Sequence, residues 1–203
     1  MDAAFGPRVR FLGLQGSRAR GEASATSDID AVLVLDALTP RDVDAYRELL
    51  DGLPHRELAC GFLSGRDELL AWDAADLVQF VHDTTPIRGS LAELLPRLDA
   101  AAVARAVTAG AGNVYHGAVH TLVHTRSPET IAGLAKAAAF VVQARHLQRT
   151  GTHVRRQTDL LDVVDPADRD VLALALAVRG GAAVDVDRDG RLLFGWAQRV
   201  LVG

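Results

Sequence analysis

Residues 14–36 read LQGSRARGEASATSDIDAVLVLD, and this segment is the most informative part of the chain about its fold. A glycine–serine pair stands near its start, and two acids, Asp28 and Asp30, follow after a small polar segment. The apolar run Ile29–Leu35 is rich in β-branched residues, so it predicts a buried strand. Side chains at positions i and i+2 of a strand point to the same face. We therefore expect the two carboxylates to converge on one spot.

Two carboxylates that close together repel each other unless a cation lies between them. Mg²⁺ binds oxygen ligands and keeps positions open for phosphate oxygens, so Asp28 and Asp30 are the candidate metal ligands and catalytic residues. Gly16 lets the backbone approach a phosphate, and the hydroxyl of Ser17 can donate a hydrogen bond to it. The stretch thus combines a candidate phosphate-binding turn, the phosphate cradle, with a pair of candidate metal ligands. Phosphoryl transfer requires both.

The hydrophobic pattern divides the chain into two parts. In the first part, strands are predicted around this motif and helices between them: strands at 8–14, 29–35 and 57–64, helices at 40–50 and 67–80, and a loop at 83–89. From residue 90 onward the pattern favours helices: 90–98, 100–124, 128–148, 157–161, 166–179, and a helix or short strand after Gly190. We therefore expect an α/β (α+β) domain with a mixed sheet over residues 1–90 and an all-helical domain over residues 91–203.

Composition narrows the class of protein. The net charge is −4, which argues against a duplex nucleic-acid binder because such a protein needs a basic face. No apolar stretch is long enough for a membrane span, and the first ten residues contain no apolar signal core. A single cysteine, Cys60, excludes an internal disulfide framework. We expect a cytoplasmic protein that acts on a small molecule.

The motif resembles that of a known superfamily. The order hydrophobic–Gly–Ser, about ten residues, Asp-x-Asp is similar to the signature of the DNA polymerase β-like nucleotidyltransferases, and Arg20-Gly21-Glu22 resembles the R-G-E of many small members. The resemblance implies Mg²⁺-dependent transfer of a nucleoside monophosphate from an NTP, with ATP as the expected donor. It also implies that Gly16, Ser17 and Arg20 bind the nucleotide.

A second resemblance concerns the middle of the chain. Residues 62–77 and 80–91 are similar to the kanamycin-type aminoglycoside nucleotidyltransferases, in which a helical domain closes over the substrate. This implies a hydroxyl of a small-molecule acceptor, of the aminoglycoside kind, and is compatible with a homodimer. Lys136 resembles the lysine of that family that binds the triphosphate. It is the only lysine beside twenty-one arginines, although a lysine at the edge of a helix is the simpler interpretation.

The sequence departs from the family at the third carboxylate. The family has an acid on the strand beside the Asp-x-Asp strand, and here the alignment places Ala59 at that position. Glu57 or Asp83 could replace it, or the acid is absent. In the latter case the chain would be a nucleotide-binding sensor without catalysis. A third alternative is a protein AMPylator or antitoxin-type enzyme, whose acceptor is a hydroxyl of a partner protein.

Three histidines, His116, His120 and His124, recur every four residues of a predicted helix. Such a stripe is compatible with packing or interdomain hydrogen bonding, with a role in binding the acceptor, or with a metal site, since histidines four apart can bind zinc. The sequence leaves their role open.

Overall fold

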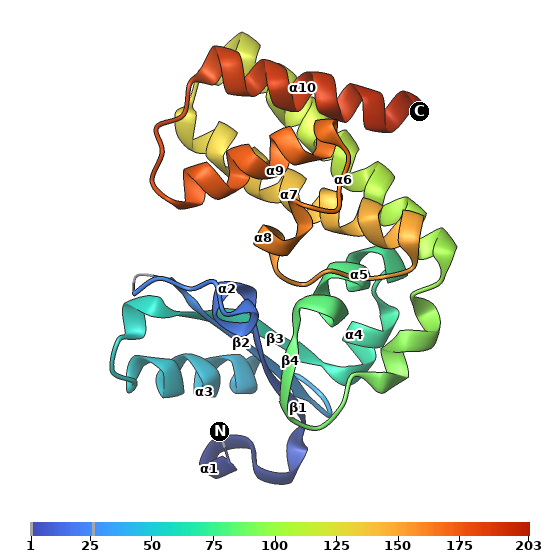
Figure 1. The fold of residues 1–203 in the computed structure, drawn as a ribbon. Coiled ribbons are helices and arrows are strands. Elements are labelled where there is room, and N and C mark those ends of the chain that lie inside the picture. Colours follow the sequence, from blue (N-terminus) through green and yellow to red (C-terminus); the bar gives the residue numbers. More distant parts are fainter. Residues whose placement is uncertain (1, 26) are drawn as a thin grey trace. The chain divides into compact units, whose positions relative to one another are not determined.

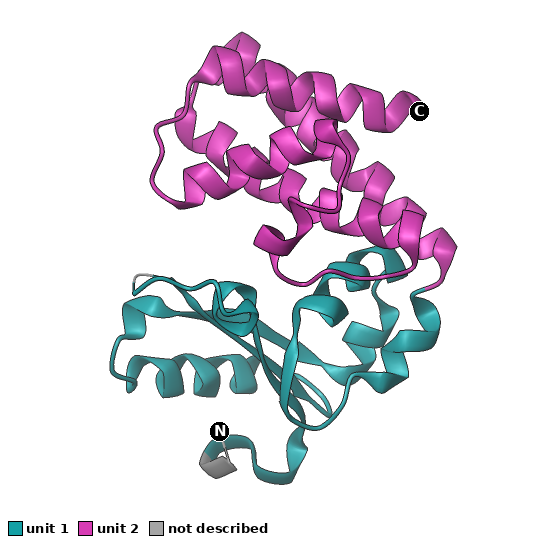
Figure 2. Ribbon diagram, viewed as in Figure 1, with its two compact units in different colours: residues 1–98 teal, residues 99–203 magenta. Residues whose placement is uncertain are grey.

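The computed structural model describes residues 2–25 and 27–203, and the chain divides into two compact units, residues 1–98 and 99–203 (Figure 2). The division follows Leu98, eight residues after the boundary predicted at residue 90. The reason is the 3₁₀-helix η3 (Ala92–Arg97), which packs against the first unit through Leu94. Leu94 is 1% exposed and packs in one core with Phe11 and Val32.

A mixed four-stranded sheet forms the centre of the first unit. Its strands, in the order β3-β2-β1-β4 across the sheet, are β1 (Val9–Gln15), β2 (Ile29–Leu35), β3 (Ala59–Gly65) and β4 (Thr85–Arg88). β1 is antiparallel to β2 and to β4, whereas β2 and β3 are parallel. The predicted mixed sheet is confirmed.

The strand β4 lies where the sequence predicted a loop, and that prediction is wrong. Its four residues include Pro86 and the largely exposed Ile87, so they lack the alternation that marks a strand. Pairing with β1, in which Leu14 lies opposite Thr85, defines this strand.

Helices cover both faces of the sheet (Figure 1). α3 (Pro40–Asp51) covers the face on which Leu33 packs with Tyr46, and α4 (Arg66–Ala71) and α5 (Ala74–Asp83) cover the other face. The single helix predicted over 67–80 is thus two helices. The break occurs because the side chain of Asp73 accepts a hydrogen bond from the amide of Ala75 at 2.7 Å and begins a new helix there. The remaining short elements are α1 (Asp2–Phe5), η1 (Gly6–Arg8), α2 (Gly16–Arg20) and η2 (Arg56–Leu58).

The second unit contains helices and, among its described residues, no strand. These are α6 (Ala100–His120), the π-helical turn η4 (Thr121–Thr125), α7 (Pro128–Thr150), α8 (Gln157–Leu160), α9 (Pro166–Arg179) and α10 (Val186–Val202). α10 begins before Gly190 because the side chain of Asp185 caps it, accepting from the amide of Arg188 at 2.9 Å. Gly190 therefore lies inside the helix, where a side chain would contact Leu122.

One apolar core holds this unit together. Small residues of α7, such as Ala135 and Ala139, are fully buried and let α6 approach closely. Trp196 of α10 is 1% exposed, and its indole Nε1 donates to the buried Asp168 at 2.8 Å. Asp168 also accepts a hydrogen bond from Nε of Arg145 at 3.2 Å. These two hydrogen bonds and the charge of Arg145 offset the free-energy cost of removing the carboxylate from water. Among the described helices, none is both long and apolar enough to span a bilayer.

Candidate active site

The glycine of the Gly-Ser turn, Gly16, lies directly against a candidate metal ligand. Asp30 is the second residue of β2 and lies opposite Gln15, the last residue of β1. Gly16 follows at once with a φ of +72°, and a Cβ atom built on it would lie 2.0 Å from Oδ2 of Asp30. Asp28 is exposed and directly precedes β2. The structure therefore brings the Gly-Ser turn and the Asp-x-Asp strand to one end of the sheet.

Arg18 connects the two halves of the motif. Its Nε and Nη2 donate to the carbonyl oxygen of Ser27 at 3.1 and 2.7 Å, and its Nε also donates to that of Asp28 at 3.2 Å. The short helix α2 thus holds the backbone that leads into β2. Sequence reasoning missed this role, because nothing distinguishes Arg18 from the other arginines of the chain.

Arg20, predicted to bind nucleotide, is buried between two carboxylates. Its Nη1 donates to Asp83 of α5 at 2.6 Å and its Nε to Glu22 at 2.9 Å, and all three side chains are at most 5% exposed. Burial alone would lower the pKa of Arg20, but the hydrogen bonds to Asp83 and Glu22 raise it above its usual value.

The same end of α5 is also bound from β1. The amide group of Gln15 donates to the carbonyl oxygen of Phe80 at 3.2 Å and to the hydroxyl of Thr84 at 3.1 Å. Gln15 directly precedes α2, and Arg20 is the last residue of α2 and donates to Asp83. The Gly-Ser turn is therefore hydrogen-bonded to α5 from the residues on both of its sides. This geometry makes Arg20 a residue that positions the turn.

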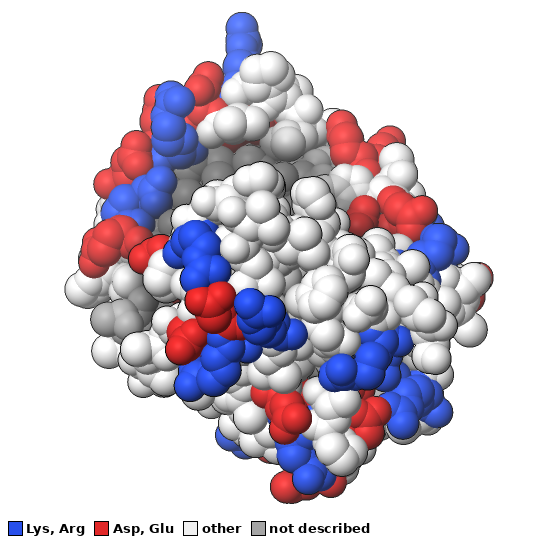
Figure 3. All heavy atoms as spheres, turned by 90° about the horizontal axis from the view of Figure 1, so that it is seen from above, with Lys and Arg blue, Asp and Glu red and all other residues white. Residues whose placement is uncertain are grey.

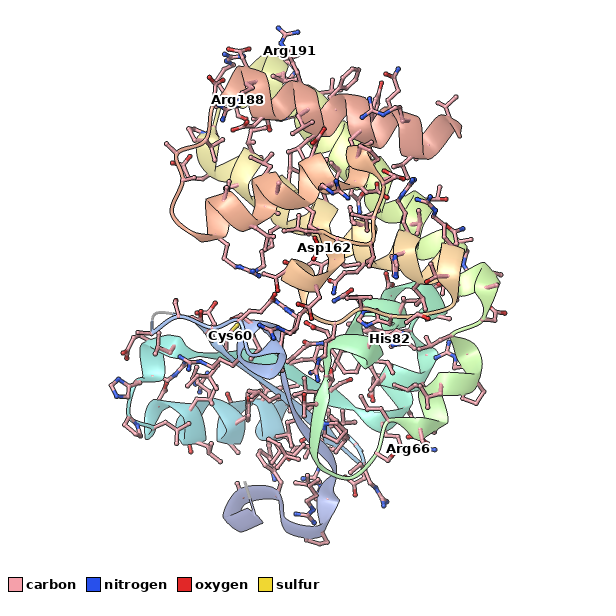
Figure 4. All side chains as sticks on the ribbon, viewed as in Figure 1. Cys60, Arg66, His82, Asp162, Arg188 and Arg191 are labelled. Atoms are coloured by element: carbon pink, nitrogen blue, oxygen red, sulfur yellow. The ribbon has the colours of Figure 1, made fainter. Side chains whose placement is uncertain are left out.

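The strand beside β2 presents a thiol next to Asp30. In the parallel pairing of β2 with β3, Asp30 lies opposite Cys60, and Ala59 lies opposite Ile29. Cys60, labelled in Figure 4, is exposed and lies at the end of the sheet where β2 and β3 begin.

The two residues considered as substitutes for the third acid are engaged elsewhere. Glu57 is exposed and lies 3.5 Å from Nδ1 of His55, while Asp83 is paired with Arg20. Within residues 2–25 and 27–203, no group of three or more His, Cys, Asp or Glu side chains is placed to hold a metal ion. The donor set at the motif is thus two carboxylates. This set fits Mg²⁺, which is commonly held by one or two protein carboxylates and completed by substrate phosphates and water.

The other candidate residues lie in the second unit. Lys136 is exposed on α7, and in the described part of the chain it has no carboxylate partner. His116 and His120 lie on α6 and His124 on η4, and all three are exposed. Packing in the core of the second unit therefore does not explain the histidine stripe, and the other interpretations stay predictions.

Comparison with known proteins supports the interpretation of the motif. Residues 4–81 match the family model described as a nucleotidyltransferase domain, which includes α2, β2 and β3. The whole chain is similar in structure to spectinomycin adenyltransferase AAD(9) from Enterococcus faecialis, crystallised with ATP and spectinomycin. The TM-score is 0.64 at 13% sequence identity, over 99% of this chain and 94% of that one. No curated protein matches the chain in sequence. The predicted superfamily is thereby confirmed, and residues 4–81 form a nucleotidyltransferase domain.

Proposed function

We propose that the chain transfers a nucleoside monophosphate from ATP to a hydroxyl group of a small-molecule acceptor and releases pyrophosphate. The observation that carries this proposal is the contact of Gly16 with the carboxylate of Asp30, because it joins a phosphate cradle to a metal ligand. The similar spectinomycin adenyltransferase was crystallised with ATP and spectinomycin, which supports both the donor and the class of acceptor.

The charged surface supports a small acceptor. On the face shown in Figure 3, basic and acidic side chains are interspersed around a broad area that carries neither. A protein that follows a nucleic-acid backbone needs a continuous basic surface instead. We propose that the helical unit, residues 99–203, supplies residues that bind the acceptor.

In this mechanism Asp28 and Asp30 would hold Mg²⁺, which supplies charge neutralisation at the phosphates when it is bound. Ser17 donates its hydroxyl to a phosphate oxygen, and Gly16, which has no side chain, leaves room for the carboxylate of Asp30 beside the turn. Arg18 fixes the approach of the chain to Asp28. The acceptor hydroxyl attacks the α-phosphorus in line with the leaving pyrophosphate, so catalysis rests on positioning and on charge stabilisation.

A non-catalytic nucleotide sensor is the second candidate function. The observation that favours it is the thiol of Cys60 opposite Asp30, on the strand where the family has its third carboxylate. Such a protein would bind ATP through the same turn without transferring its nucleotide.

The experiment that separates these functions measures pyrophosphate release with ATP, Mg²⁺ and a panel of acceptors that includes spectinomycin and aminoglycosides. We expect release with at least one acceptor, and we expect Asp28→Asn and Asp30→Asn to abolish it. Both variants should keep the parent melting temperature, since each removes one of two repelling charges. Parent-like turnover in either variant would refute the metal assignment.

Two other results point to the alternatives. ATP binding by the parent protein without release for any acceptor would favour the sensor. Incorporation of labelled AMP into a protein, rather than into a small molecule, would favour the AMPylator.

A further inference from the structure

The three exposed histidines of the helical unit are unequally spaced. The ring centroids of His116 and His120 are 6.2 Å apart, whereas those of His120 and His124 are 5.0 Å apart. Both pairs are four residues apart in sequence, so a uniform α-helix would give them the same backbone spacing.

The backbone also differs between the two pairs. α6 ends at His120, and the chain continues as the π-helical turn η4, in which the amide of Arg126 donates to the carbonyl of Thr121 at 2.9 Å. This hydrogen bond spans five residues instead of four, and it makes the turn wider and flatter. The pair with the closer rings, His120 and His124, is the one that includes this turn.

The closer spacing is the one that a shared metal ion requires. A Zn–N bond of about 2.1 Å and a distance of about 1.1 Å from the nitrogen to the ring centre put each centroid about 3.2 Å from the ion. Two such rings are about 5.2 Å apart at a tetrahedral angle and about 4.5 Å apart at a right angle. The 5.0 Å of His120 and His124 lies between these values. The 6.2 Å of the other pair would need an angle of about 150°, which neither geometry offers.

We propose that His120 and His124 bind a divalent transition-metal ion, for which Zn²⁺ is the probe, with solvent completing the coordination. Imidazole nitrogen is a ligand that suits such ions, whereas Mg²⁺ prefers oxygen. Arg126 follows His124 by two residues, and its positive charge would repel a metal ion. The carboxylate of Asp187 offsets this charge, because Nη1 of Arg126 donates to it at 2.9 Å. Among the described residues, no three or more His, Cys, Asp or Glu side chains are grouped to hold a metal ion. A site with two histidines as its protein ligands agrees with this.

The site is independent of the proposed function, since it uses none of the residues of the nucleotidyltransferase motif. Other exposed groups can also bind zinc, so the design must separate them. Excess Mg²⁺ occupies the carboxylates Asp28 and Asp30. His116→Ala is the matched control, since it removes an exposed histidine of the same stripe and keeps the closer pair intact.

The test is an isothermal titration of the full chain with ZnCl₂ in excess Mg²⁺, repeated with His120→Ala, His124→Ala and His116→Ala. We expect about one ion per chain at the tightest site, an affinity at least about tenfold weaker in the first two variants, and an affinity within about twofold of the parent in the control. Zinc should also raise the melting temperature of the parent and of the control only.

Several results would overturn the proposal. These are no zinc binding by the parent, parent-like affinity in either His120→Ala or His124→Ala, and an equal loss in His116→Ala. All three side chains are exposed, so loss of the fold is not expected to obscure the result. His120→Gln, which keeps a polar side chain of similar size, repeats the test if His120→Ala melts at a lower temperature.

Discussion

Replacing Gly16 by alanine should disable the metal site through Asp30, with little effect on the fold. The new Cβ would lie 2.0 Å from Oδ2 of Asp30, whereas an ordinary van der Waals contact is at least 3.4 Å. The carboxylate must therefore move by about 1.4 Å, and a misplacement of about 1 Å can lower a reaction rate about 100-fold. We expect Gly16→Ala to lower turnover by about two orders of magnitude and to raise the Mg²⁺ concentration needed for half-maximal activity.

Gly21→Ala is the matched control. Gly21 has a φ of +73°, nearly the same as the +72° of Gly16, so alanine has the same backbone strain of roughly 1–2 kcal/mol at either position. A Cβ on Gly21, however, meets nothing within 4 Å. Both variants should therefore lose similar thermal stability, while only Gly16→Ala loses activity.

The assay is pyrophosphate release over a Mg²⁺ titration, with melting temperatures measured in parallel. Parent-like activity in Gly16→Ala would refute the proposed role of Asp30 as a metal ligand beside this turn. Equal losses of activity in both variants would assign the effect to backbone strain instead.

Three further predictions concern the surroundings of this contact. Ser17→Ala should weaken ATP binding by about 1.5–3 kcal/mol, the contribution of a hydrogen bond to a charged group, and unchanged binding in an ATP titration would place the phosphates elsewhere. Asp83→Asn should lower both the melting temperature and the affinity for ATP, because it removes one buried partner of Arg20; a fall in the melting temperature alone would limit the pair to a structural role. Lys136→Ala should lower turnover by about 10²–10³ if the lysine stabilises the triphosphate, and Lys136→Arg should restore little. Turnover within a few-fold of the parent would leave Lys136 as an ordinary surface residue.

The elements that could be predicted are those with strong local signals. The strand Ile29–Leu35 has the predicted bounds, because an uninterrupted β-branched run after two acids leaves few alternatives. The helix Pro166–Arg179 also has its predicted bounds, because Asp165 caps it and proline stands at its first position. The Gly-Ser and Asp-x-Asp segments are close in sequence. Their proximity in space could therefore also be predicted from this one stretch of the chain.

The features that could not be predicted depend on partners far along the chain. The strand Thr85–Arg88 exists through its pairing with β1, some seventy residues earlier. The ion pair of Arg20 with Asp83 joins residues 63 positions apart, and nothing in the sequence near Arg20 indicates that partner. The opposition of Cys60 and Asp30 depends on the register of β3 against β2, and a shift of one residue would have reversed the face of every side chain.

The guanidinium of Arg18 has a consequence for how this domain can diverge. It donates from α2 to the backbone carbonyls of Ser27 and Asp28, so it holds the two halves of the motif together in addition to the hydrogen bonds between Ser24 and Ser27. Lengthening a flexible connection has only a small entropic cost, about 0.6 kcal/mol for each doubling. Insertions after Ala23 should therefore be tolerated as long as Arg18 is kept. Relatives that lack an arginine at this position should need either a connection of fixed length or another brace between the two segments.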